Sequence, residues 1–266
     1  MVNPDGDQPK PNDLFGAISR LSPTSVSAWT WCPRRYYLKY GLGLPESDAG
    51  ASTDLGKLVH SVLAHLHTRG DCHDEAAVQQ VLVDNGCDSD VMRALLAQHR
   101  ERCPRAVDEG HHDVGRARYH HTPPPYFLAT AELDAVWIHD GLFDIRDYKT
   151  GGTTRLELRD DEQARVQAWV WAPLAARKNL RLRLRYEYLA PEVDEPDPWE
   201  PDDEDLAGVE TWLTDIVADM RKGAFEGVAD EQRCRSCSFR SICSDSAAPS
   251  EPVWPVLGAS AADRDL

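Results

Sequence analysis

Four cysteines have the residue type and spacing of a metal centre. Three of them form a C-x2-C-x5-C segment near the carboxyl end of the chain: Cys234, Cys237 and Cys243. Cys32, which lies far upstream, would complete the four ligands of a zinc site or of a cuboidal iron–sulfur cluster. The spacing leaves both metals open. The remaining cysteines are scattered and are interpreted as ordinary thiols: Cys72, Cys87 and Cys103.

Disulfides or buried thiols are the alternatives for these seven cysteines. The first twenty residues lack the apolar core of a signal peptide, and no apolar run is long enough to cross a membrane. We therefore expect a cytoplasmic protein without a membrane partner, in which disulfides would be rare.

A second group of residues has the chemistry of a hydrolytic metal site. Asp134 and Asp147 occur on two segments that we expect to pair as a β-hairpin, and Lys149 follows Asp147. The carboxylates would converge at one end of the sheet, and Lys149 would share a face with Asp147 because strand side chains alternate with a period of two. Carboxylates bind Mg²⁺ or Mn²⁺, which can activate water toward a phosphodiester. An exposed strand face without catalytic role is the alternative.

The hairpin is predicted from its period and its turn. Residues 127–138 and 142–148 are typical of strands, and His139-Asp140-Gly141 between them is typical of a tight turn. Alternating apolar and charged residues at 180–188 predict another strand. The apolar spacing predicts further helices at 74–83, 89–101, 161–178 and about 205–222.

Three helices are expected near the beginning of the chain. Ser22 would cap the first, with Pro23 at its first position, and Pro33 would end it and open the next. The third has apolar residues spaced by three and four: Leu55, Leu58, Val59, Val62, Leu63 and Leu66. This order of elements predicts an α/β fold, with a small mixed central β-sheet flanked by helices.

The distribution of charge bears on nucleic-acid binding. The net charge of −16 argues against a protein whose whole surface binds DNA, so any DNA-binding lysines and arginines must be concentrated in one place. Arg34, Arg35 and Lys39 form such a group, either for binding a DNA strand or as solvated bases on a helix. Nine acids and no bases fall in residues 192–205, an acidic loop that would repel DNA but suit a basic partner, or act as a disordered tether.

The length of 266 residues suits one large domain with appendages. Residues 1–20 and 245–266 are polar and poor in apolar side chains, so both ends are expected to be disordered. Residues 21–244 would form the folded domain.

Six motifs in this domain resemble, in the same order, those of the RecB-like branch of the PD-(D/E)XK nucleases. That branch includes the CRISPR-associated type-four (Cas) iron–sulfur exonucleases. The motifs are Trp31-Cys32-Pro33-Arg34-Arg35 after the opening helix, Gly56-x3-His60, Glu132-Leu133-Asp134, Asp147-Tyr148-Lys149, Gln167-x3-Trp171 and the three-cysteine segment. Trp171 stands where the family usually has tyrosine.

The resemblance implies a restriction-endonuclease-like core and a role for each motif. It implies a [4Fe–4S] cluster that joins the N- and C-terminal segments through Cys32, Cys234, Cys237 and Cys243. It implies Mn²⁺ or Mg²⁺ held by His60, Asp134, Asp147 and the carbonyl of Tyr148, and a catalytic set of Asp134, Asp147, Lys149 and Gln167. Alternatively, His60 is a core histidine, Gln167 a solvated helical residue, and Trp171 a core residue rather than a surface for stacking bases.

The function expected from this resemblance is metal-dependent DNA exonuclease activity on single strands or DNA ends, in DNA repair or recombination or in CRISPR spacer acquisition. Basic and aromatic residues would track the strand: Arg34, Arg35, Lys39, Tyr36, Tyr37 and Tyr40. A catalytically weak binding module that assembles with a helicase, repair or CRISPR integrase complex is the first alternative, and a zinc-stabilised helical adaptor is the second. No G-x4-G-K-[ST] phosphate loop occurs, so coupling to ATP would need a partner.

Overall fold

The computed structural model describes residues 20–46, 51–103, 111–114, 118–121, 127–151, 157–190, 193 and 195–248. Most residues of the two ends expected to be disordered, 1–20 and 245–266, lie outside these ranges. The chain divides into two compact units, one of Met1–Ser27 with Ala49–Gly223 and one of Ala28–Asp48 with Ala224–Leu266.

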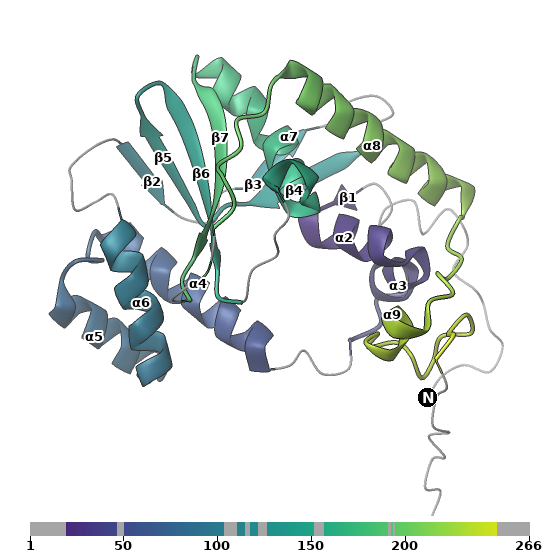
Figure 1. Cartoon of the computed structure of the whole chain (residues 1–266), viewed down its shortest axis with the longest axis horizontal. Helices are drawn as coiled ribbons and strands as arrows, with labels where there is room; N and C mark the ends of the chain where they lie inside the picture. Colours follow the sequence, from purple (N-terminus) through teal and green to yellow (C-terminus); the bar gives the residue numbers. More distant parts are fainter. Residues whose placement is uncertain are drawn as a thin grey trace, which may run out of the picture. The chain divides into compact units, whose positions relative to one another are not determined.

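The first unit contains two small sheets where the sequence predicted one central sheet (Figure 1). The larger has the order β2-β5-β6-β7, and only its β6–β7 pair is parallel. The smaller has the order β1-β4-β3, with β1 parallel to β4. Their bounds are β1 Arg20–Leu21, β2 His111–Val114, β3 Arg118–His121, β4 Leu128–Glu132, β5 Ala135–His139, β6 Leu142–Lys149 and β7 Arg181–Tyr188.

The predicted single strand over 127–138 is wrong. It is two strands, β4 and β5, that belong to different sheets, and the chain bends between them at Leu133 and Asp134. The predicted hairpin between β5 and β6 is confirmed, with Ala135 opposite Arg146. Asp140 and Gly141 form its turn at φ 46° and 72°, the left-handed region that two-residue hairpin turns require.

Helix α7 (Glu162–Arg177) connects β6 to β7, and the three elements form a β-α-β crossover. Asp161 caps α7, because its Oδ1 accepts a hydrogen bond from Ala164 N at 2.8 Å. The helix packs against β7 and β4, and α8 (Asp203–Lys222) packs on α7. Trp171 is buried in this layer and stacks on Phe143, with ring centroids 6.2 Å apart, so it is a core residue.

Three helices form a second layer in the first unit. Helix α4 (Ala51–Arg69) contacts α5 (Glu75–Asp84), α6 (Asp90–Arg102) and β2. The apolar face predicted for α4 is confirmed, since Val59, Val62, Leu63 and Leu66 are all buried. None of the helices in the described part of the chain is both long and apolar enough to traverse a bilayer.

The described part of the acidic segment 192–205 is bound to the protein itself. Glu200 accepts hydrogen bonds from Arg181 at 2.6 Å and from Arg183 at 2.9 Å. Trp199 is buried and exchanges backbone hydrogen bonds with Leu184 of β7. Arginines of β7 therefore neutralise part of the negative charge that was expected to suit a basic partner.

Helix α2 (Pro23–Trp31) begins as predicted, because Ser25 N donates to Ser22 Oγ at 3.2 Å. In the second unit, Pro33 opens α3 (Pro33–Tyr36), which continues as the π-helical segment η1 (Tyr37–Gly41). The short helix α9 (Glu231–Arg235) comes from the other end of the chain.

Candidate functional site

The first unit brings together the residues that the sequence proposed for a hydrolytic metal site. Because Ala135 pairs with Arg146, the bend before β5 places Asp134 beside the end of β6. Tyr148 N donates to Asp134 Oδ2 at 3.0 Å. His60, on α4, contacts Asp134 Oδ1 through Nδ1 at 2.9 Å and the carbonyl oxygen of Tyr148 through Nε2 at 2.7 Å. His60 is thus positioned by two of its predicted co-ligands.

Gly56 explains how α4 comes close to this strand end. A Cβ atom at this position would lie 3.3 Å from Thr150 Oγ1, closer than most van der Waals contacts. Glycine one turn before His60 therefore permits a close approach of the helix to the residue that follows Lys149. This close approach gives the Gly-x3-His spacing a structural reason.

Asp147 and Lys149 form the second half of the site. Their side chains are paired at 2.5 Å between Asp147 Oδ2 and Lys149 Nζ, which confirms that they share a face of β6. Lys149 Nζ also lies over the ring of Tyr186, 4.1 Å from its centroid. Asp147 is buried, whereas the Lys149 side chain is 24 % exposed, so the ammonium group borders solvent.

Two glutamines on α7 hold the Asp147 carboxylate. Gln167, which the sequence proposed, donates to Asp147 Oδ1 at 3.1 Å and is buried rather than solvated. Gln163, which the sequence analysis missed, donates to the same oxygen at 2.6 Å and accepts from Lys149 Nζ at 2.8 Å. Residues four apart share a helix face, so a second glutamine one turn before Gln167 was the available signal.

The electrostatics of this site suit a cation. Burial raises the pKa of Asp147, the Lys149 charge opposes that rise, and the neighbouring Asp134 carboxylate adds to it. Burial alone would lower the pKa of His60, but the hydrogen bond and charge of Asp134 outweigh burial and raise it. Two carboxylates, a carbonyl oxygen and an imidazole form a donor set that suits Mn²⁺ or Mg²⁺, so the residues present fit such an ion.

Gln163→Ala is expected to lower the metal-dependent hydrolysis predicted for this site about 10- to 100-fold, because Lys149 and Asp147 would lose their shared hydrogen-bond partner. The assay is cleavage rate as a function of Mn²⁺ concentration, in which the concentration for half-maximal rate should also rise. Gln80→Ala on α5, where the exposed Gln80 donates to Asp84 of the same helix, is the matched control. Equal rates for both variants would remove Gln163 from the site.

The four cysteines proposed as cluster ligands line one pocket of the second unit: Cys32, Cys234, Cys237 and Cys243. Cys32 Sγ accepts a hydrogen bond from Val228 N at 3.5 Å, and Cys234 Sγ accepts one from Ala247 N at 3.4 Å. Arginines share the lining: Arg35, Arg233 and Arg240. Backbone donors and guanidinium groups stabilise thiolates, so the donor set fits an iron–sulfur cluster or tetrahedral zinc.

The basic residues proposed to bind DNA also lie in the second unit. Arg35 and Lys39 both pair with Glu46, at 2.8 and 2.5 Å, and Arg34 donates to Ser244 at 2.8 Å. All three remain partly exposed.

The tyrosines proposed for the same groove mainly pack within the second unit. Tyr36 is buried against Trp29, with ring centroids 5.6 Å apart, so it does not offer a face to a base. Tyr37 packs on Phe225 at 5.0 Å.

Comparison with known proteins gives one family and two similar structures. A model of the PD-(D/E)XK nuclease superfamily matches residues 20–244. The crystal structure of a putative exonuclease from Eubacterium rectale has a similar fold, with a TM-score of 0.53. Its sequence is 12% identical to this chain, and the match covers 90% of this chain and 92% of that one. This similarity shows the fold. The structure of SSO0001 is 13% identical with a TM-score of 0.39, covering 85% and 86%. No curated protein matches the chain significantly.

Proposed function

Because the chain belongs to the PD-(D/E)XK nuclease superfamily, we propose that it is a Mn²⁺- or Mg²⁺-dependent deoxyribonuclease that acts on single-stranded DNA or DNA ends. The observation that carries this proposal is the convergence of His60, Asp134 and the Tyr148 carbonyl at the end of β6, where Asp147 and Lys149 pair.

Each residue has a proposed role in hydrolysis. A bound Mn²⁺ or Mg²⁺ would supply a Lewis acid and a water of lowered pKa. Its ligands would be His60, Asp134, Asp147 and the carbonyl of Tyr148. Lys149 would orient the attacking water and stabilise negative charge on the phosphate, since its ammonium group borders solvent. Gln163 and Gln167 would hold the Asp147 carboxylate in place as a ligand of this ion.

The second unit has a proposed structural role. We propose that Cys32, Cys234, Cys237 and Cys243 hold a [4Fe–4S] cluster that joins segments from the two ends of the chain. The shared pocket and the backbone donors to sulfur support this proposal. The proposed contacts to DNA phosphates are Arg34, Arg35 and Lys39. On binding DNA, these side chains would leave their present partners, Glu46 and Ser244, and pair with phosphates of the strand. A helicase, repair or CRISPR integrase complex remains the proposed wider partner.

Removal and return of the metal tests the proposed activity. Wild-type protein, purified without oxygen, is expected to shorten end-labelled linear single strands with Mn²⁺, to lose the activity in EDTA, and to regain it with Mn²⁺ or Mg²⁺. A circular single strand of the same sequence is the matched control, and an exonuclease leaves it intact. Cleavage of the circular strand would show that the activity is endonucleolytic and would contradict the proposed exonuclease. Failure of folded, metal-supplied protein to cut any substrate would favour the binding module.

A further inference from the structure

Two short sequence pairs place four soft metal ligands in the first unit. His67 lies near the end of α4 and Cys72 in the turn that follows, while His99 lies in the last turn of α6 and Cys103 directly after it. The pairs have the form H-x4-C and H-x3-C. Spacings of two to five residues are typical of zinc ligands, because both members of a pair reach one ion. The interpretation of Cys72 and Cys103 as scattered thiols is therefore wrong, because the fold brings them together with two histidines. Cys87 does have the contacts of an ordinary thiol, since its Sγ faces the carbonyl oxygen of Leu82.

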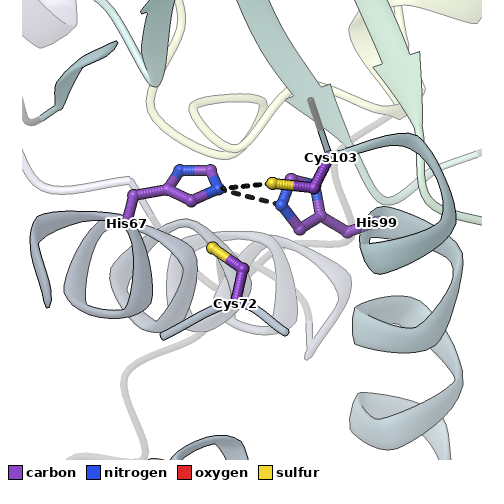
Figure 2. A group of neighbouring side chains, drawn as sticks. All are labelled: His67, Cys72, His99 and Cys103. Atoms are coloured by element: carbon purple, nitrogen blue, oxygen red, sulfur yellow. Dashed lines mark hydrogen bonds between the residues drawn. The ribbon is translucent and has the colours of Figure 1, made fainter. Parts of the chain in front are cut away.

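The four side chains converge on one point (Figure 2). One ligand atom from each lies within 4.8 Å of all the others. His67 Nε2 is 2.9 Å from His99 Nε2, and Cys103 Sγ is 3.8 Å from His67 Nε2. Tetrahedral bonds of about 2.0 Å to nitrogen and 2.3 Å to sulfur separate such ligands by about 3.3 to 3.8 Å. An ion would fit after the imidazoles part by a few tenths of an ångström.

The surroundings of these residues are apolar. All four residues are at most 3 % exposed. Apolar side chains from α4 and α5 belong to the same hydrophobic core as the two cysteines: Leu63, Leu66 and Val81. Burying thiols and imidazoles in such a core is costly unless they are bonded. Coordination by a metal would compensate that cost, and full burial behind four protein ligands is the mark of a structural rather than a catalytic site.

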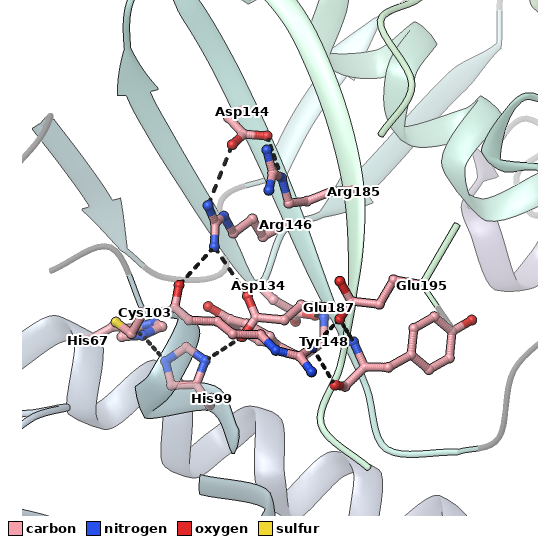
Figure 3. Close-up of polar contacts among 12 residues, drawn as sticks. His67, His99, Cys103, Asp134, Asp144, Arg146, Tyr148, Arg185, Glu187 and Glu195 are labelled. Carbon is pink, nitrogen blue, oxygen red and sulfur yellow. Dashed lines mark hydrogen bonds and ion pairs between the residues drawn. The ribbon is translucent and has the colours of Figure 1, made fainter. Parts of the chain in front are cut away.

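A carboxylate behind His99 has the position of an outer-shell partner. Glu187 Oε1, on β7, lies 2.8 Å from His99 Nδ1, and Arg146 donates to the other carboxylate oxygen at 3.3 Å (Figure 3). Arg146 in turn pairs with the buried Asp144 at 3.7 Å. A carboxylate that binds one ring nitrogen directs the other toward a metal and increases the basicity of the imidazole. The sheet is thus built to orient His99 Nε2 into the cluster.

We propose that His67, Cys72, His99 and Cys103 form a tetrahedral structural zinc site, whose ligands are distinct from those of the nuclease centre and from the four cysteines in the second unit. Two thiolates and two imidazoles select Zn²⁺ over Mn²⁺ or Mg²⁺, which prefer oxygen ligands. The ion would fix the ends of α4 and α6 to each other, and through Glu187 to β7. Helix α4 also carries His60, so this site would stabilise the element that completes the active site.

Metal analysis of the full-length protein tests the site. In a Cys237→Ser background, which removes a ligand of the other centre, protein expressed with zinc is expected to retain about one zinc per chain. Adding Cys103→Ala should reduce this to near zero, whereas adding Cys87→Ala, a second buried thiol of the same unit, should leave it unchanged. Zinc absent from the background protein, or retained with Cys103→Ala, would overturn the proposal.

A spectroscopic measurement keeps the test valid if Cys103→Ala fails to fold. Co²⁺ added to metal-free Cys237→Ser protein should give the intense visible bands of tetrahedral cobalt with thiolate charge transfer, and one equivalent of Zn²⁺ should remove them. Weak octahedral bands would overturn the proposal. So would a Cys72–Cys103 disulfide, detected by mass spectrometry in protein that binds neither ion.

Discussion

Asp147→Asn is expected to lower the rate of DNA cleavage by about 1,000-fold while the protein remains folded. The substitution preserves shape and keeps an oxygen that can accept from Gln163 and Gln167. It removes one of the two carboxylate charges that would hold the metal, and the charge that orients Lys149. Because burial and Asp134 already disfavour a charged Asp147, a neutral residue should not destabilise this unit greatly. The measurements are single-turnover cleavage with Mn²⁺ and thermal unfolding.

Asp140→Asn is the matched control for this experiment. It removes one carboxylate from the turn of the same hairpin, at a position with φ of 46° that asparagine tolerates. We expect wild-type cleavage from this variant. If Asp147→Asn cleaves as fast as Asp140→Asn, the proposed metal site is wrong, even if the family assignment holds.

Cys237→Ser is expected to abolish the brown colour of anaerobically purified protein and to reduce its iron from about four per chain to near zero. Three remaining thiolates leave one iron without a protein ligand, which makes a cuboidal cluster labile. The helices in the described residues of the second unit are short, and a loss of the cluster should expose this unit to proteolysis. Visible absorption, iron content and limited proteolysis measure these effects.

The matched control is Cys87→Ser in the first unit, where the new hydroxyl can replace the thiol that faces the carbonyl of Leu82 at 3.6 Å. This variant should keep both colour and iron. Colourless wild-type protein with about two zinc ions per chain, of which Cys237→Ser loses about one, would instead identify the four-cysteine centre as a zinc site. Colour that survives Cys237→Ser would contradict the ligand assignment.

The sequence predicted those elements whose period and end signals agree. The β5–β6 hairpin has an Asp-Gly turn, and α7 begins after a capping aspartate, so β6 and α7 appear close to their predicted bounds. The change of sheet between β4 and β5 was not predictable in this way. Residues 127–138 contain neither glycine nor proline, and both halves are consistent with one strand. Only the pairing partners separate them.

The candidate site divides along the same line. Asp134 lies in the bend before β5 rather than on a strand. Asp147 and Lys149 could be placed from strand period alone, because both lie on β6. Gln163 could not, since its role depends on the orientation of α7 against β6, which packing determines. The cluster around His67 was missed for a similar reason. Each pair of ligands is weak by itself, and two helices must pack side by side to unite them.

Tyr148 connects the two proposed metal sites of the first unit. Its carbonyl contacts His60, whereas its ring packs against His67 and His99, with centroids 5.9 and 5.0 Å away. An ion at either site would restrict the same residue and so reduce the conformational entropy that the other ion must remove. Linkage makes this effect reciprocal: zinc would increase the affinity for Mn²⁺ by the same factor by which Mn²⁺ increases the affinity for zinc. Zinc in the buried site would then lower the Mn²⁺ concentration at which the nuclease site is half-occupied.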